Sequence, residues 1–233
     1  MPNYFWIAID GPVASGKSSV TRYLAQKLHL TYIDTGAMYR AVTWLAIRNG
    51  VSVDDPSALV ELIDKAEIVI RSPLPSENHG RLSTVLVNGQ DVSWLIRQEP
   101  VNARVSTVAA HHEVRSKLVV KQRFLALNQD VIMEGRDITY RVLPEAQLKI
   151  YLTASEEERI KRHYFELIKL QPEITLEQAG TSLRQRDKND KTRVTDPLRI
   201  MPDAWVVDTT KLSIVEVANL IMNEAMAIRS KIK

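Results

Sequence analysis

The chain has 233 residues and no cysteine, carries a net charge of +3, and is 45% hydrophobic and 25% charged. This length suits one α/β domain with insertions or two small domains, and the lack of cysteine excludes disulfides and thiolate metal sites. No apolar run reaches the roughly 18 residues that span a membrane, no signal peptide is visible, and the charge is too small to indicate nucleic-acid binding, so we expect a cytoplasmic protein.

A phosphate-binding motif lies near the start of the chain. Residues 5–10 predict a strand, and apolar residues at helical spacing follow as far as Leu28. The loop between them, residues 11–19, fits G-x-x-x-x-G-K-S/T at every fixed position. Lys17 can reach the β- and γ-phosphates of ATP, and the Ser18 hydroxyl can ligate Mg²⁺. A chance glycine-rich turn is the alternative, which the flanking strand and helix disfavour. The residues expected to bind the triphosphate are Gly11, Pro12, Val13, Ala14, Ser15, Gly16, Lys17, Ser18 and Ser19.

The next stretch changes from alternating strands and helices to a β-rich pattern. Its predicted elements are a strand at 30–33, a helix begun by Asp55-Pro56, a strand at 67–72, a polar loop at 73–80, and strands at 82–87 and 90–92. Asn88-Gly89, between the last two strands, is the strongest short hairpin signal. We therefore interpret residues 67–99, approximately, as a small antiparallel β insertion.

The rest of the chain returns to strands alternating with helices. Its predicted elements are two helices within 101–128 that meet near His111, strands at 130–133, 148–152 and 205–208, helices opened by capping boxes at Ser155 and Thr175, and a last helix at 214–227. Five short buried strands separated by helices predict an α/β fold, with a five-stranded parallel sheet covered on both faces. We expect one domain over 1–233, with a short helical lid at about 156–175.

Charged residues near the predicted strand ends extend the candidate site. Ligands of such sheets bind at the carboxyl ends of the strands, where Arg40 and Arg136 are expected to lie. Arg186, Asp190 and Arg193 are spaced to share one helical face. Such spacing usually marks a solvated salt-bridge ladder, but its place directly before the fifth strand favours a polar wall over the phosphate cleft.

Further basic residues include those of the predicted lid and a pair of histidines. Arg159, Lys161 and Arg162 could close over the triphosphate, although an exposed basic helix face explains them equally well. The pair His111-His112 lacks the spacing typical of zinc sites, so we assign it no metal role.

Taken together, these residues resemble the bacterial-type cytidylate kinases over nearly the whole chain. Besides the phosphate loop, the matching stretches are 33–40 (Ile-Asp-Thr-Gly-Ala-Met-Tyr-Arg), Gly135-Arg136-Asp137, Arg186-Asp187 with Asp190 and Arg193, and the hairpin around Asn88-Gly89. The resemblance implies a P-loop kinase that transfers the γ-phosphoryl group of ATP to CMP or dCMP with Mg²⁺. Glu134 stands where the family often has Asp, and Asn189 and Lys191 stand where an arginine is common.

The resemblance also implies roles for individual residues. Arg40, Arg136 and Arg193 would hold the acceptor phosphate, with Lys17, Arg136 and Arg193 as the catalytic cations. Ser106, Arg115 and Asp137 would read the base, Arg186 and Asp190 would contact the sugar, and Thr35 would line the acceptor site. The expected partners are the small nucleotides alone, and we expect a monomer.

Two rival activities have to be weighed against this one. The first is a kinase for another small molecule, such as adenylate or shikimate, which the insertion and the late Arg–Asp–Arg face disfavour. The other is a phosphate-loop switch or a nucleic-acid-dependent ATPase. The chain has neither an Asn-Lys-x-Asp sequence for guanine nor a basic–aromatic stripe for single strands, which disfavours this rival.

Overall fold

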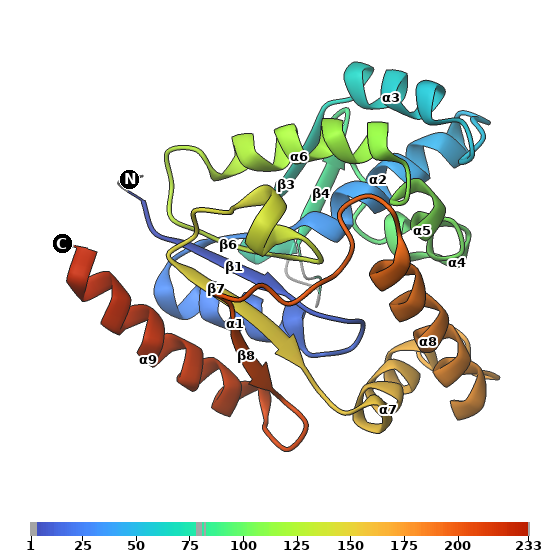
Figure 1. Ribbon diagram of the computed structural model, residues 1–233. Coiled ribbons are helices and arrows are strands. Elements are labelled where there is room, and N and C mark those ends of the chain that lie inside the picture. Colours follow the sequence, from blue (N-terminus) through green and yellow to red (C-terminus); the bar gives the residue numbers. More distant parts are fainter. Residues whose placement is uncertain (1–3, 78–80, 82, 233) are drawn as a thin grey trace.

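The computed structural model describes residues 4–77, 81 and 83–232, and these form a five-stranded parallel sheet and a smaller antiparallel sheet. The parallel sheet has the order β2-β6-β1-β7-β8, which confirms the predicted architecture (Figure 1). Its strands are β1 (Trp6–Asp10), β2 (Thr31–Asp34), β6 (Val131–Gly135), β7 (Leu148–Thr153) and β8 (Trp205–Asp208). No helix within the described part of the chain is long and apolar enough to cross a membrane.

Alternating side chains of the central strand reach the two helical layers. Ile7 and Ile9 belong to an apolar cluster with residues of α1 (Lys17–Leu28) and α9 (Ile214–Ile232). Ala8 belongs to a second cluster on the other face, with residues of α6 (His112–Ala126). Figure 1 shows α1 and α9 on one side of the sheet and α6 on the other. A strand buried on both faces explains why residues 5–10 are continuously apolar as far as Asp10.

The register of the strands aligns their polar last residues. Asp10 of β1 lies opposite Gly135 of β6, and Asp34 of β2 lies opposite Glu134 of β6. Since all three strands run parallel, their carboxyl ends form one edge of the sheet. Three carboxylates are therefore placed beside the loops that follow these strands.

The insertion is a three-stranded antiparallel sheet, as predicted, made of β3 (Ile68–Arg71), β4 (Thr84–Val87) and β5 (Gln90–Asp91). Asn88 and Gly89 both have positive φ, 50° and 77°, as a type I′ turn requires. Leu82 and residues 78–80 of the predicted strand and loop lie outside the described residues.

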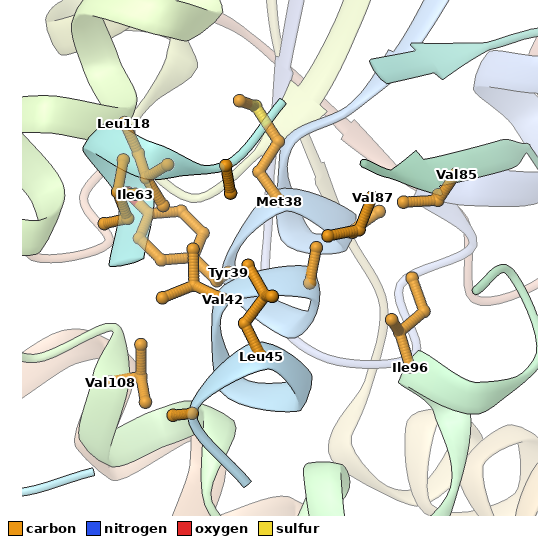
Figure 2. Packing of buried hydrophobic residues seen from close by; sticks show 14 of the residues in the cluster. Met38, Tyr39, Val42, Leu45, Ile63, Val85, Val87, Ile96, Val108 and Leu118 are labelled. Carbon is orange, nitrogen blue, oxygen red and sulfur yellow. The ribbon is translucent and has the colours of Figure 1, made fainter. Parts of the chain in front are cut away.

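The insertion shares its hydrophobic core with α2 (Thr35–Arg48) and α3 (Pro56–Lys65). Figure 2 shows Met38 of α2 beside Val87 and Val85 of β4, while Tyr39 of the same helix extends toward Ile63 of α3. All five side chains are buried, so the insertion is fixed against the helix that begins at the cleft. Two short 3₁₀ helices, η1 (Pro75–Glu77) and η2 (Leu95–Arg97), complete this part of the chain.

Several helices differ from the prediction in their bounds. Residues 101–128 contain a long helix, α6, that follows its cap His111, but the stretch before it forms two single-turn helices, α4 (Glu99–Asn102) and α5 (Val105–Val108). A π-helix, η3 (Ile138–Val142), follows β6 and was not predicted. The last helix continues to Ile232, beyond the predicted end at Ala227. The segment predicted as a lid, 156–175, contains α7 (Glu156–Leu167) and ends directly before α8 (Leu176–Thr192).

Candidate active site

A cavity of about 260 Å³ opens at the carboxyl edge of the parallel sheet. It is lined by most of the phosphate loop and by residues of α2, α5, α6, β6 and α8. The predicted site residues that line it are Val13, Ala14, Ser15, Gly16, Lys17, Ser18, Ser19, Thr35, Arg40, Ser106, Arg115, Arg136, Asp137, Arg186, Asp190 and Arg193. The fold thus collects residues from distant parts of the chain around one space.

The phosphate loop depends on a close approach to β7. A Cβ atom on Gly11, whose φ is +156°, would lie 2.1 Å from the carbonyl oxygen of Leu152. Any side chain there would force the loop away from the neighbouring strand. Gly16, with φ of 87°, directly precedes α1, so the positive end of that helix faces the cavity. Gly11 and Pro12 do not line the cavity and instead shape the loop behind it.

Lys17 is buried, at 6% exposure, at the first position of α1. Its Nζ donates to the carbonyl oxygen of Pro12 at 2.6 Å and to the Ser15 hydroxyl at 3.2 Å. Burial, with the nearby Arg136 as a second cause, lowers the pKa of Lys17 to about 7. A buried ammonium group whose acceptors are neutral is poised to bind an anion.

An acidic pocket lies next to the phosphate loop. Ser18 donates through its hydroxyl to Glu134 Oε2 at 3.0 Å, and the Tyr32 hydroxyl donates to Glu134 Oε1. Burial, followed by the negative charge of Asp34, raises the pKa of Glu134 to about 7. An oxygen-ligating cation would relieve this cost.

These groups fit Mg²⁺ as it is held in kinases. The described residues contain no group of three or more side chains that could cage a metal by themselves. Mg²⁺ typically takes one or two protein oxygens and completes its shell with phosphate and water. The hydroxyl of Ser18 and the carboxylate of Glu134 supply such a pair.

The Arg–Asp–Arg cluster lines the cavity, but its partners differ from a simple ladder on one helix. Asp190 of α8 accepts from Nε of Arg136 at 2.7 Å and lies 3.6 Å from Nη1 of Arg193. Burial would raise the pKa of Asp190, but Arg136, Arg193 and Arg186 outweigh it and hold that pKa below its usual value. Arg193 lies at the C-cap, just beyond α8. The cluster therefore joins α8 to the end of β6.

Arg40 and Arg97 add positive charge on the insertion side. Burial, followed by the charges of Arg186 and Arg97, lowers the pKa of Arg40 to about 9. Arg97, from η2, lines the same cavity and lies 3.2 Å from Asp34. Guanidinium groups that lie close together and half-buried favour binding of an anion with several oxygens, such as phosphate.

A buried ion pair, Arg115 with Asp137, forms part of the cavity lining. Arg115 of α6 donates to Asp137, which directly follows Arg136, and to the carbonyl oxygen of Ala109 at 3.1 Å. Arg115 is 1% exposed and its guanidinium lies over the ring of Tyr39, 5.3 Å from the ring centroid. Ser106 of α5 lines the cavity as well. The pair presents fixed donors and acceptors of the kind that can read the edge of a base.

The two predicted lid arginines lie outside this cavity. Arg159 is buried and donates from Nη1 to Asp187 and, at 3.1 Å, to the carbonyl oxygen of Val13. Arg162 donates to the hydroxyl and the carbonyl oxygen of Thr209, at 2.9 and 2.8 Å. Arg162 lines a second cavity, of about 400 Å³, on the other side of the phosphate loop beside Gly16. Their contacts with the triphosphate remain a prediction.

Some residues of the site were not predicted from the sequence. Asp187 accepts from the backbone N–H of Val13 at 3.2 Å, and Asp34 caps α2 by accepting from Ala37. Asp10 accepts from the backbone N–H groups of Ile138 and Thr139 at 2.8 and 2.9 Å. Asp10 ends the first predicted strand and Asp34 directly follows the second, and this position at strand ends could have indicated both residues. The roles of Asp187 and Arg97 depend on long-range contacts that no local pattern indicates.

Comparisons with known proteins agree with this geometry. The family model for cytidylate kinase matches residues 7–227. A protein of Geobacillus sp. (strain WCH70) named "Cytidylate kinase" is 46% identical over 222 residues, which is 95% of this chain and 96% of that protein. The protein of the same name from Bacillus velezensis is 45% identical, over 93% of this chain and 94% of its own length.

A solved structure of an uncharacterised protein from Eubacterium ventriosum has a TM-score of 0.53 at 11% identity, over 96% of this chain and 99% of that one. At that identity the likeness concerns the fold alone.

Proposed function

The chain belongs to the cytidylate kinase family, and from this premise we propose that it transfers the γ-phosphoryl group of ATP to CMP or dCMP. The observation that carries the proposal is the cavity that joins the phosphate loop to a cluster of arginines. A donor and an acceptor phosphate can meet there without solvent between them. We further propose that residues 1–233 act as one monomeric kinase domain in the pyrimidine nucleotide metabolism of the cytoplasm.

The donor half is built from the phosphate loop. Its backbone N–H groups and Lys17 would hold the triphosphate, while Ser18 and Glu134 would hold Mg²⁺. The second cavity begins at Gly16 and is lined by apolar side chains of Leu212 and Val217. A flat aromatic base fits such a lining, so we place the adenine of ATP there, next to Arg162.

The acceptor half is built from the arginines that line the cavity and from the ion pair of Arg115 with Asp137. Arg40, Arg136 and Arg193 would bind the phosphate of CMP, and Thr35 would line this part of the site. Asp190, kept ionised by its arginines, can accept hydrogen bonds from ribose hydroxyls beside Arg186. The remaining group, which consists of Ser106, Arg115 and Asp137, would read the cytosine edge.

Transfer requires positioning and charge neutralisation rather than a protein nucleophile. A phosphate oxygen of CMP attacks the γ-phosphorus, and the bond to the β–γ bridging oxygen breaks, which gives CDP and ADP. Lys17, Arg136 and Arg193 line the space where negative charge gathers in the transition state. Bound Mg²⁺ would neutralise further charge on the phosphates. The acceptor oxygen is already anionic near neutral pH, so no general base is assigned.

An acceptor panel tests the proposal. The purified protein is incubated with ATP and Mg²⁺ and with CMP, dCMP, UMP, AMP or shikimate, and ADP formation is measured. We expect CMP and dCMP to be the best acceptors. Preferred turnover of AMP or shikimate would contradict the proposal, and so would ATP hydrolysis that depends on added nucleic acid.

A further inference from the structure

Asp196 lies outside the cavity but contacts two arginines that line it. The residue follows α8 and Arg193, and its carboxylate side chain is 15% exposed. Its φ is 47°, a left-handed conformation that few residues other than glycine adopt, with Asn and Asp among the more tolerant. Such a conformation persists only where the surrounding structure fixes it. Here the carboxylate and the backbone carbonyl of Asp196 both accept hydrogen bonds from arginines.

The carboxylate of Asp196 holds Arg115. Its Oδ2 accepts from Nε of Arg115 at 3.2 Å, while the other two nitrogens of that guanidinium donate to Ala109 and Asp137. All three nitrogens of Arg115 are therefore occupied, and the plane of the group is fixed. The other carboxylate oxygen, Oδ1, lies 3.5 Å from Nε of Arg141, which does not line the cavity.

The backbone carbonyl of Asp196 holds Arg193. It accepts from both Nε, at 2.8 Å, and Nη2 of that side chain. The remaining nitrogen, Nη1, is then directed toward Asp190 at 3.6 Å. The loop itself is fixed on both sides, because Leu198 donates to the Asp190 carbonyl at 2.7 Å and the Tyr140 hydroxyl donates to the Pro197 carbonyl at 2.6 Å.

Asp196 contacts two like charges through different groups, its carboxylate and its backbone carbonyl. Arg115 and Arg193 each have a side chain that is less than a tenth exposed, and each pairs with an acid that faces the cavity, Asp137 and Asp190 respectively. Without the carboxylate, Arg115 would lose the hydrogen bond that fixes its plane and a negative charge that offsets its own.

We propose that Asp196 is a positioning residue that sets the base selectivity of the acceptor site by fixing Arg115 against Asp137. Its carbonyl group at the same time aligns Arg193 with the acceptor phosphate. The inference rests on the proposed function, because it assumes that Arg115 and Asp137 face the base of CMP. Asp196 itself does not line the cavity and touches no substrate in this scheme.

Two substitutions remove the carboxylate but keep the backbone. Asp196→Asn retains the shape of the side chain and Asp196→Gly removes it, and both Asn and Gly tolerate left-handed φ. The carbonyl group that holds Arg193 survives in both. Arg141→Gln is the matched control, since it breaks the other contact of the same carboxylate and leaves Arg115 in place.

The measurement is kcat/KM for CMP divided by kcat/KM for UMP. CMP and UMP carry the same phosphate, so a general change in the potential of the site cancels from this ratio. We expect Asp196→Gly, which removes the acceptor, to lower the ratio about tenfold, as for a lost hydrogen bond to a charged group, with the KM for ATP changed less than about twofold. Asp196→Asn removes the charge but keeps an amide oxygen that can accept from Arg115, so its ratio should fall less. Arg141→Gln should keep the wild-type ratio. Thermal melts show whether each variant is folded. Equilibrium titrations with CMP and with UMP give the corresponding ratio of binding affinities without turnover.

The outcomes separate this inference from the proposed function. A wild-type enzyme that transfers no phosphoryl group to CMP would overturn the proposed function, whereas one that uses CMP and UMP equally would overturn this inference alone. A selective wild type with an unchanged ratio in folded Asp196→Gly would overturn the positioning role alone. An equal fall of the ratio in Arg141→Gln would overturn it too, because the ratio would then report the general order of the loop.

Discussion

Lys17 is the residue whose loss should separate catalysis from folding most cleanly. Its ammonium group faces the cavity and contacts the carbonyl of Pro12 and the hydroxyl of Ser15. Lys17→Met keeps the length of the side chain and removes the charge. We expect kcat/KM to fall about 10²–10³-fold, as for other groups that stabilise charge in a transition state. Steady-state kinetics measure the loss, and near-normal turnover in a folded variant would contradict the assignment.

The same substitution should change how stability depends on pH. The pKa of Lys17 is about 7 in the folded protein, against 10.5 for a lysine in water, so the unfolded chain binds more protons between these values. The stability of the wild type should therefore rise with pH across that window, while Lys17→Met lacks this rise. Denaturant unfolding without nucleotide should give Lys17→Met a larger free energy of unfolding than the wild type below pH 7. This difference should shrink toward pH 10. A constant difference would contradict the lowered pKa.

Asp190 provides the second test at the residue scale. Its carboxylate accepts from Arg136 at 2.7 Å and lines the cavity, so Asp190→Ala should raise the KM for CMP and lower kcat, with the KM for ATP changed much less. A lost charged hydrogen bond of roughly 1.5–3 kcal/mol corresponds to about ten- to more than a hundredfold in kcat/KM. Asp203→Ala is the control, because Asp203 pairs with Lys149 on the surface. If both variants kept wild-type kinetics, the ion pair between Asp190 and Arg136 would have a structural role only.

The individual residues of the site differ in how far sequence could predict them. Lys17 and Ser18 follow from a motif with fixed spacing, and Arg136 follows from its place after a strand. Asp187 and Asp196 could not be found this way, because their partners are Val13 and Arg115, far away in the chain. A residue that acts through another residue leaves no local pattern.

At the scale of elements, α7 and α8 are joined to the phosphate loop by one buried ion pair. Arg159 and Asp187 contact each other, and together they bind both backbone groups of Val13. Arg159→Met should cost about 3–5 kcal/mol, because it leaves a buried carboxylate unpaired. It should also raise the KM for ATP, since Val13 loses the partner of its carbonyl group. Chemical denaturation and ATP-dependent kinetics measure the two effects.

A double substitution separates the two effects of this pair. Arg159→Met with Asp187→Leu removes both charges, so part of the stability should return while the KM for ATP stays high. The control is Arg184→Ala, which breaks an exposed ion pair with Glu156 between the same two helices. It should change stability by less than about 1 kcal/mol. If the double variant recovered a wild-type KM for ATP, the pair would not be supporting the loop.

The elements that sequence predicted correctly are those with strong local signals. The five strands of the parallel sheet, the Asn88-Gly89 hairpin and the capping box at Thr175 all appear where they were expected. The burial prediction was wrong for β8, an edge strand in which only Val207 is buried. The π-helix η3 did not, because the carboxylate that caps it belongs to Asp10, 128 residues earlier in the chain. Pro100, at the start of α4, favours a helix start rather than a continuous helix in this stretch.

At the scale of the whole molecule, the cavity is assembled from segments that span almost the entire chain. Its lining begins at Val13 and ends at Arg193. The alternation of strands and helices predicted that the strand ends would meet at one edge, which is why most of the site could be found by position. The number of short helices around α2 depended on packing against the insertion and could not be predicted in the same way.

The central position of the first strand has a consequence for the synthesis of this protein. Phe5 donates to a carboxylate 125 residues later, and the Thr209 hydroxyl donates to the carbonyl oxygen of Ser15, 194 residues away. A nascent chain therefore carries an unpaired apolar strand until β6 and β7 have been made, and its phosphate loop stays incomplete until β8 has been added. We expect a chain that ends at residue 204 to bind a hydrophobic dye strongly and ATP not at all, as measured by fluorescence and calorimetry. An exposed apolar strand of this kind is expected to bind chaperones during translation. If the truncated chain bound ATP, the phosphate loop would reach its binding conformation before the sheet is complete.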